Sequence, residues 1–369
     1  MDIRLPLIII CSLMLVACTK SQPEESRSFR MGVTPWPADF TEAAVNKAYQ
    51  FIQTDCDLIS QHLDDGIPWQ EALDGRDFPR QFIQDISGRI ARTPQGKKVL
   101  LSVAPLDLSR KNKAACYTAN GANQVPANVL QYWSNLSMDH PQVITAYCNY
   151  LNRLIALFKP DFVNYGVESN LSTWPDSTFA QYRNFLAAVY QNMKQTHSEL
   201  PFFISFMTED VARSEQLAGQ LTDYTDWIAL SSYPYISSAA AASDPDALPN
   251  NYFERYFQLA PQKPVAFAET GYAAENLNIP ELFMNRVINE QQQKQYLEKL
   301  LTICRIKKAR LLIWFCSSDY DAGVQTLRNN GFYQPLFSLW KDIGFYNEAG
   351  RPRPALSRWK QEFLLPFNE

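Results

Sequence analysis

The chain has 369 residues, which exceeds one average domain and fits a single large α/β barrel. Apolar residues make up 46% and charged residues 20%, so the composition is that of a globular protein and excludes collagen, coiled coil and disorder. The net charge is −4, and no basic patch is present that could neutralise the phosphates of a nucleic acid. The aromatic content of 13% is high and suits both core packing and stacking on flat apolar faces such as sugar rings.

Metal-ligand patterns are absent from the sequence. The three histidines, His62, His140 and His197, are scattered, and no Cys-x-x-Cys occurs. Asp319 and Asp321 could bind a cation or cap a helix, although such acids most often face solvent. We therefore expect neither a metal centre nor a cofactor, and no feature indicates an oligomeric state.

The first segment has the pattern of a secretory signal. Arg4 precedes about thirteen apolar residues, Leu5 to Ala17, which would rise roughly 20 Å as a helix. That is too short to cross a hydrocarbon core of about 30 Å, so residues 1–17 are interpreted as a signal peptide rather than a membrane anchor.

The signal ends in Leu15-Val16-Ala17-Cys18, which resembles the lipobox of bacterial lipoproteins. The resemblance implies that Cys18 becomes the lipidated first residue and attaches the chain to a membrane. Because Thr19 rather than Asp follows, it also implies the outer membrane of a Gram-negative cell envelope. Residues 18–28 are polar and predict a tether, which leaves residues 29–369 as one domain.

Five cysteines remain beyond Cys18. An odd number in an exported chain predicts at least one unpaired thiol, and no pairing can be assigned. Two of them lie in apolar strand-like runs, where a small buried hydrophobe is the expected role. The five are Cys56, Cys116, Cys148, Cys304 and Cys316, of which the first and last lie in these runs.

Short apolar runs then alternate with amphipathic segments, which is typical of a parallel sheet with crossover helices. Eight runs predict strands: Phe29–Trp36, Cys56–His62, Lys98–Ala104, Phe162–Glu168, Phe202–Met207, Trp227–Tyr233, Pro264–Glu269 and Leu311–Cys316. The predicted helices include Thr41–Gln53, Arg80–Arg92, Gln142–Phe158, Phe179–Gln195, Val211–Leu221 and Glu290–Ile306.

Eight strand-helix units over this length predict a (β/α)8 TIM barrel. An open doubly wound sheet is the alternative, but it would usually carry a Gly-rich turn after the first strand, and Gly32-Val33-Thr34-Pro35-Trp36 is not one. The third unit carries an extra polar stretch, Asp107–Ser137, which would lie at the C-terminal face of the barrel and shape a cleft there.

Two carboxylates stand out at the C-terminal strand ends, where barrel chemistry takes place. Glu168 closes the fourth strand and Glu269 closes the seventh. An ionisable group at the end of a buried strand costs free energy unless it is paired or functional. The two could therefore face each other across the barrel mouth, although two unrelated strand-end acids held by salt bridges would give the same pattern.

A glutamate ending strand four and another ending strand seven resembles the clan of retaining β-glycosidases with (β/α)8 folds. Within that clan, the stretches 227–235 (WIALSSYPY) and 265–272 (VAFAETGY) are similar to the endo-β-1,4-galactanase family. The resemblance implies that Glu168 is the acid/base, that Glu269 is the nucleophile and that Tyr233 donates a hydrogen bond to it. It also implies that Trp314 forms the aromatic floor of a sugar site.

The chain departs from this clan at one position. An asparagine that bonds the sugar 2-hydroxyl usually precedes the acid/base glutamate, and here that residue is Val167. Asn164 or Asn170 could replace it, and Asn170 is the better candidate because Asn164 should point into the barrel or the helix layer. We further expect Glu168 to be held protonated, and Glu269 to stay ionised because Tyr233 and His62 donate to it.

Other strand-end residues are candidate sugar contacts. His62 ends the second strand, and the aromatic side chains offer flat faces with one polar group each. For Trp36 and Trp69, packing into the loop core is the competing interpretation, and for His62 it is a purely structural role. Besides His62, Asn170, Tyr233 and Trp314, the candidates for substrate binding are Trp36, Trp69, Trp174, Tyr235 and Tyr272, whereas Trp133, Trp340 and Trp359 are expected to pack.

The sequence therefore predicts a membrane-tethered retaining glycoside hydrolase acting on a β-linked poly- or oligosaccharide. A catalytically inactive barrel that captures glycan at the cell surface is the first alternative, and Val167 favours it. A structural envelope lipoprotein without a ligand is the second. It predicts that Trp36, Trp69 and Trp314 do not share one open cleft.

Overall fold

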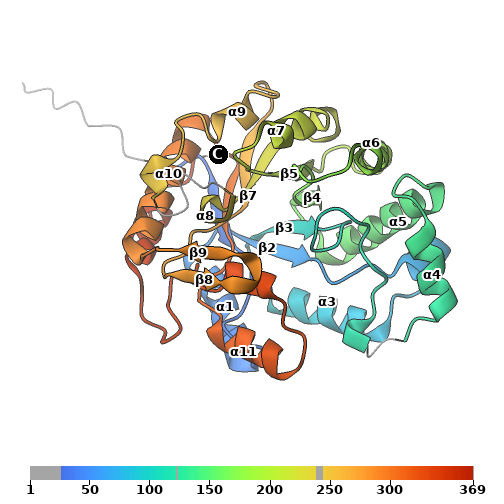
Figure 1. The fold of residues 1–369 in the computed structure, drawn as a ribbon, viewed down its shortest axis with the longest axis horizontal. Helices are drawn as coiled ribbons and strands as arrows, with labels where there is room; N and C mark the ends of the chain where they lie inside the picture. Colours follow the sequence, from blue (N-terminus) through green and yellow to red (C-terminus); the bar gives the residue numbers. More distant parts are fainter. Residues whose placement is uncertain (1–25, 122–123, 238–243, 369) are drawn as a thin grey trace, which may run out of the picture.

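The computed structural model describes residues 26–121, 124–237 and 244–368. Eight parallel strands close into a barrel whose neighbours follow chain order, and helices surround it (Figure 1). This confirms the predicted (β/α)8 barrel and excludes the open doubly wound sheet. The predicted signal, Cys18 and residues 18–25 of the predicted tether lie outside the described residues.

Each predicted strand corresponds to one strand of the barrel. The barrel strands are β1 Arg30–Val33, β2 Leu58–Leu63, β3 Lys98–Val103, β4 Phe162–Gly166, β5 Phe202–Met207, β6 Ile228–Ser232, β7 Val265–Thr270 and β10 Leu311–Trp314. A separate hairpin follows β7 and consists of β8 Leu277–Ile279 and β9 Met284–Arg286.

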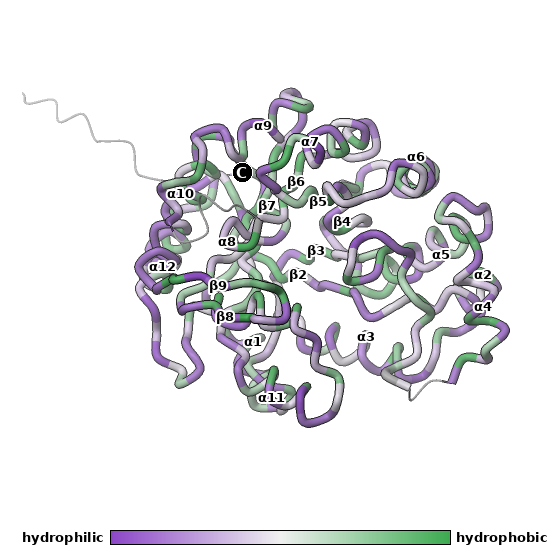
Figure 2. The backbone as a smooth tube through the Cα atoms, in the orientation of Figure 1, coloured by the Kyte–Doolittle hydropathy of each residue, from purple (hydrophilic) through white to green (hydrophobic). Residues whose placement is uncertain are grey.

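The predicted amphipathic segments form helices close to the expected bounds. The α-helices are α1 Glu42–Asp55, α2 Trp69–Asp74, α3 Arg80–Arg92, α4 Ala127–Asn135, α5 Pro141–Phe158, α6 Asp176–Thr196, α7 Ala212–Gly219, α8 Pro234–Ser237, α9 Glu254–Phe257, α10 Glu290–Lys307, α11 Asp321–Asn329 and α12 Pro354–Phe363. Short 3-10 helices are η1 Ala119–Gly121, η2 Thr222–Tyr224, η3 Pro245–Ala247, η4 Pro280–Leu282 and η5 Pro335–Leu339. Hydrophilic segments lie along the outer helices and loops (Figure 2).

The barrel interior changes from apolar to polar along the strands. Leu100 on β3 and Phe203 on β5 belong to a buried apolar cluster, and two residues further along the same strands stand Ser102 and Ser205. Between them, the Asn164 amide donates to Ser102 Oγ at 3.1 Å and to Ser205 Oγ at 3.2 Å. The C-terminal half of the barrel is thus lined by hydrogen-bonding groups, which can support charged side chains above them.

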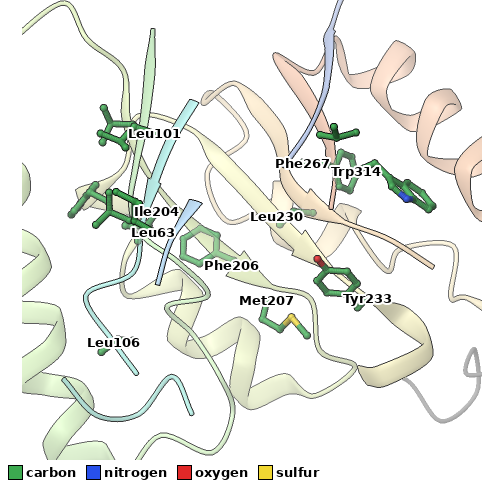
Figure 3. Close-up of a cluster of buried hydrophobic side chains, with 14 of the residues drawn as sticks. Leu63, Leu101, Leu106, Ile204, Phe206, Met207, Leu230, Tyr233, Phe267 and Trp314 are labelled. Carbon is green, nitrogen blue, oxygen red and sulfur yellow. The ribbon is translucent and has the colours of Figure 1, made fainter. Parts of the chain in front are cut away.

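The larger apolar layer lies between the barrel and its helices. Figure 3 shows part of it, with Leu101, Ile204, Leu230, Phe267 and Trp314 drawn as sticks. Because side chains alternate between the two faces of a strand and both faces are covered, these strands are nearly continuous apolar runs. This explains why their positions were predictable.

Two further observations concern membrane-spanning helices and the pairing of cysteines. Within the described ranges, no helix has the length and apolar content that a membrane span requires. Among the same residues the five cysteines are free, and four of them are buried: Cys56, Cys148, Cys304 and Cys316.

Gly344 allows two loops at the end of the barrel to approach closely. Its N–H donates to Asp319 Oδ1 at 2.8 Å, and a Cβ added there would lie 2.3 Å from the backbone N of Asp319 and from the backbone C of Ser318. Backbone atoms cannot yield as a flexible side-chain end can, so only glycine fits at this position.

We therefore predict that Gly344→Ala lowers the free energy of unfolding by about 1–3 kcal/mol or more, as overpacking does. Urea unfolding followed by circular dichroism would measure it. Gly219→Ala is the matched control, because its Cβ would meet only Leu259 Cδ2 at an ordinary 3.6 Å. That control should change stability by less than about 1 kcal/mol, and equal effects of the two substitutions would contradict the assignment.

Candidate active site

A β-bulge places Glu269 at the end of β7. The register with β6 pairs Leu230 with Phe267 and then Ser231 with Glu269, so Ala268 is the extra residue. Bulges redirect side chains and are common beside active sites. Here the bulge puts Glu269, instead of Ala268, opposite Ser231.

Glu269 has two polar neighbours. Tyr233 Oη donates to Glu269 Oε1 at 2.7 Å, and His62 Nδ1 lies 3.4 Å from Oε2. Burial raises the pKa of Glu269; the charge of Glu168 raises it as well, whereas His62 and the Tyr233 hydrogen bond lower it. The two carboxylates are therefore close enough for the charge of one to act on the other.

Glu168 lies just beyond β4 in a strained backbone conformation, with φ of 52°. Ser231 Oγ donates to its Oε1 at 2.7 Å, and Arg110 Nε donates to its Oε2 at 2.9 Å. Its backbone N–H donates to Ser205 Oγ at 3.1 Å, so the polar layer of the barrel fixes the main chain here. Both carboxylate oxygens thus have a donor.

Asp64 connects the two carboxylate environments. It accepts from Arg110, with Nη2 at 2.8 Å from Oδ2 and Nη1 at 3.1 Å from Oδ1, and its Oδ2 lies 3.6 Å from His62 Nε2. Burial opposes ionisation of Asp64, but the charge of Arg110 and the contact with His62 outweigh it and lower its pKa. Burial likewise opposes a charged His62, but Asp64 and Glu269 outweigh it and raise its pKa.

These five residues form a continuous network: His62, Asp64, Arg110, Glu168 and Glu269. Their side chains are between 9% and 15% exposed. The network is therefore mostly desolvated, which strengthens its electrostatic interactions, but it is not sealed from solvent.

The contacts of Glu168 and Glu269 differ from the protonation states that we expected for them. We expected Glu168 to be held protonated, yet it accepts hydrogen bonds at both oxygens and pairs with Arg110, which is the environment of a carboxylate. Burial, in turn, raises the pKa of Glu269, the carboxylate that was expected to stay ionised. The guanidinium that pairs with Glu168 comes from the loop after β3.

Burial corrects the predictions for two tryptophans. Trp314 is fully buried, donates from Nε1 to the Ile343 carbonyl at 2.7 Å and stacks on Phe345. Trp69 is 1% exposed and stacks on Trp133. Both side chains pack outside the barrel and do not reach a ligand at its mouth, so Trp36, Trp69 and Trp314 do not share one open cleft.

Four other predicted sugar contacts are also packing residues. Asn170 is fully buried, and its amide bonds the Met207 backbone and Ser214, so it cannot replace the missing asparagine. Trp174 is 4% exposed and stacks on Tyr182. Two tyrosines, Tyr235 and Tyr272, are fully buried and pack edge to face on one another.

Asn164, the other considered replacement, is occupied in the polar layer of the barrel. Val167 itself is 2% exposed and apolar. Neither asparagine of this segment therefore presents an amide to a sugar at the mouth, so the departure from the clan pattern is not compensated there.

Partly exposed aromatic side chains remain at the strand ends. Trp36, after β1, packs against Phe315, after β10, with ring centroids 5.8 Å apart. Trp340, expected to be a packing residue, contacts the ring of Tyr233 edge to face at 5.8 Å and is also partly exposed. Of the tryptophans predicted to bind substrate, only Trp36 is partly exposed.

Sequence reasoning missed Arg110 and Ser231. Ser231 lies inside the stretch 227–235, where serine gave no signal besides its place on a strand. Arg110 lies in the extra segment Asp107–Ser137, which was expected to shape the mouth. That segment also carries Lys111 and Lys113, so no signal in the sequence singled out Arg110.

One acidic cluster away from the network is paired with basic side chains of the chain itself. Three carboxylates lie close together near the N-terminus of α11, those of Asp319, Asp321 and Asp342. Arg353 pairs with Asp319, and Lys341 pairs with both Asp321 and Asp342. We therefore assign no metal to this group.

Two cavities of the described structure lie away from the two carboxylates. One cavity of about 500 Å³ is lined by Lys111–Cys116, Trp133 and Trp174, among others, and another of about 600 Å³ lies between the β8–β9 hairpin and α11. Neither is lined by Glu168 or Glu269. The ionisable network, rather than either of these cavities, marks the chemically distinctive region.

Comparisons with known proteins identify the fold. No protein-family model matches the chain, and no curated protein matches it by sequence. Among solved structures, the GH53 catalytic domain of Ignisphaera aggregans superposes with a TM-score of 0.57 at 17% identity, covering 92% of this chain and 97% of that one.

Two further structures are similar. Xylanase 10B of Thermotoga maritima has a TM-score of 0.58 at 11% identity, covering 91% of this chain and 95% of that one. A GH5_18 protein of Streptomyces cattleya, in complex with Manβ1-4GlcNAc, has a TM-score of 0.57 at 15% identity, covering 92% and 82%. The chain thus shares the barrel of glycoside hydrolases at distant sequence similarity.

The contrast between the two carboxylates predicts opposite effects on stability. Burial raises the pKa of Glu269, so the folded state disfavours its charge at neutral pH, and that penalty disappears as the pH falls below the ordinary glutamate value. Glu269→Gln should therefore raise the free energy of unfolding at neutral pH, and the gain should shrink in acid.

Glu168→Gln should instead lower the free energy of unfolding by about 1–3 kcal/mol, because Arg110 loses a charged acceptor. Urea unfolding between pH 4 and pH 8 would measure both variants. Equal shifts of the same sign would contradict the described pairing.

Proposed function

We propose that this chain is a retaining glycoside hydrolase that cleaves a β-linked poly- or oligosaccharide by double displacement. The observation that carries the proposal is the pair Glu168 and Glu269, which lies at the C-terminal ends of β4 and β7 within one partly exposed charged network. Support also comes from the glycoside hydrolase barrels that share the fold.

The proposed chemistry assigns one role to each carboxylate. Glu269 attacks the anomeric carbon while Glu168 protonates the leaving oxygen; Glu168 then takes a proton from the water that releases the sugar. Tyr233 steadies the attacking carboxylate through its hydrogen bond to Oε1. Retention by this route requires carboxyl groups about 5–5.5 Å apart.

A barrel that binds glycan without cleaving it is the second candidate function. Val167 in place of the usual asparagine favours it, as do the hydrogen bonds that hold the Asn170 amide to Met207 and Ser214. A purely structural lipoprotein fits the buried tryptophans, but it offers no reason to keep five ionisable groups together in a mostly desolvated cluster.

An activity screen beside a binding assay separates these candidates. Wild-type protein would be offered β-galactan, β-mannan, β-glucan and peptidoglycan fragments, with products followed by chromatography and binding by calorimetry. The proposed function predicts cleavage of at least one of them. Binding without cleavage would favour the capture role. The absence of both binding and cleavage would favour the structural role.

We predict that Glu269→Gln abolishes turnover, by at least about a thousandfold in kcat, because an amide cannot form the covalent intermediate. Circular dichroism should show an unchanged fold. Tyr235→Phe is the matched control, since its hydroxyl donates to the Leu339 carbonyl at 2.9 Å and takes no part in the network. Undiminished hydrolysis by the Gln variant would refute the nucleophile assignment.

We also propose that the chain is anchored to the cell envelope through a lipid on Cys18. What supports this is the lipobox-like Leu15-Val16-Ala17-Cys18 after a short apolar segment. The tether would hold the barrel at an outer-membrane surface, where it could meet glycan.

Cys18→Ser should therefore abolish incorporation of a palmitate analogue and move the protein out of the membrane fraction. Labelling in cells, followed by fractionation and immunoblotting, would measure both effects. Cys116→Ser, which changes a partly exposed thiol of the barrel, is the control and should stay labelled. A Cys18→Ser chain that remains labelled would exclude the anchor.

A further inference from the structure

Arg110 is built rigidly into the site by a tight loop. Its N–H donates to the Asp107 carbonyl at 2.9 Å, and Asp107 Oδ1 accepts from the hydroxyl of Ser109 at 2.6 Å. Asn112 closes the loop by donating from Nδ2 to Asp107 Oδ2 at 3.0 Å. Arg110 itself has a left-handed backbone, with φ of 59°, as does Glu168 with φ of 52°.

The guanidinium is oriented by Asp64. Because Asp64 takes both Nη1 and Nη2, the remaining Nε–H is directed at Glu168 Oε2. The side chain of Arg110 is only 9% exposed, so water does not replace these contacts easily. This geometry resembles a bidentate clamp in which one carboxylate fixes the arginine that contacts the other.

The two donors to Glu168 are not equivalent. A serine hydroxyl can turn and accept a hydrogen bond, so Ser231 can serve either protonation state of Glu168. An arginine N–H can only donate, so the Glu168 oxygen that it contacts must accept. Arg110 therefore favours the charged form specifically.

Building on the proposed function, we propose that Arg110 is a positioning residue that keeps Glu168 ionised in the ligand-free site and so sets the alkaline limit of glycoside cleavage. In the first displacement, a bond forms between Glu269 and the anomeric carbon while the bond to the leaving oxygen breaks. The proton that this oxygen receives comes from Glu168. The fraction of Glu168 that carries a proton therefore limits the step.

Other charged or titratable groups also face this carboxylate. Glu269 from β7 and Tyr233 after β6 interact with it electrostatically, whereas the neutral Ser205 of β5 contacts the Glu168 backbone N–H. Beyond Arg110 lie Asp64 and His62 of the β2 end and Tyr182 of α6. Of these groups, Arg110 alone combines a permanent positive charge with a direct contact.

Nuclear magnetic resonance tests this proposal without any substrate. The full barrel would carry glutamate labelled with ¹³C at the carboxyl carbon, and Glu168→Gln would identify the Glu168 signal. We expect Arg110→Gln to raise the pH at which that signal titrates by at least about one unit, since removing a nearby opposite charge has effects of this size. Arg110→Lys, which keeps the charge, should stay within half of that shift.

Ser231→Ala is the matched control, because it removes the neutral donor from the other oxygen and should shift the titration less than Arg110→Gln does. Arg110→Met serves as a second charge-removing variant if Arg110→Gln does not fold, as judged by circular dichroism. An unchanged or lower titration pH in the folded charge-removing variant would overturn the proposal.

Kinetics then links the residue to the reaction. The first substrate is a phenyl β-glycoside of the sugar that the wild type hydrolyses. With it, the alkaline limb of the profile of kcat/KM against pH should shift to higher pH in Arg110→Gln. For the dinitrophenyl glycoside, whose leaving group needs no proton, the profiles of variant and wild type should have the same shape.

If the alkaline limbs of wild type and Arg110→Gln coincide for the phenyl glycoside, the proposed role of Arg110 is overturned while the hydrolase proposal stands. If the wild type hydrolyses nothing, the hydrolase proposal fails instead, and the resonance titration still decides whether Arg110 controls the charge of Glu168.

Discussion

Two carboxylates can share a desolvated pocket only if positive charge and hydrogen-bond donors compensate them. In this barrel Arg110 pairs with Glu168, while Tyr233 and His62 contact Glu269. Asp64 joins both halves by holding Arg110 and approaching His62. The polar layer inside the barrel, the bulge on β7 and the loop after β3 all serve to bring these groups together.

The compensation is uneven, and this has a chemical consequence. Glu168 receives a direct ion pair, whereas Glu269 receives a neutral tyrosine hydroxyl and a histidine at a longer distance. Two chemically identical side chains are thereby placed in different electrostatic environments, and the ion pair falls on the proposed acid/base rather than on the proposed nucleophile.

The sequence predicted the barrel and the two acids because both signals are strong. Strands covered on both faces form long apolar runs, and a charge such as Glu168 or Glu269 at the end of one is conspicuous. The same property hid which aromatic residues face outward, since Trp314 lies in a run that is apolar on both faces. Arg110 was hidden because a loop has no periodicity, and its position depends on hydrogen bonds to Asp107 and Asp64.

The central claim is that the two carboxylates act as one hydrolytic pair, and covalent trapping tests it most directly. Wild-type protein would be incubated with activated 2-deoxy-2-fluoro β-glycosides of galactose, glucose and mannose, digested and analysed by mass spectrometry. The account predicts one sugar per chain, attached to the peptide that contains Glu269 and absent after Glu269→Gln. A sugar attached to Glu168 or to a residue outside the network, or an active enzyme that traps none, would contradict it.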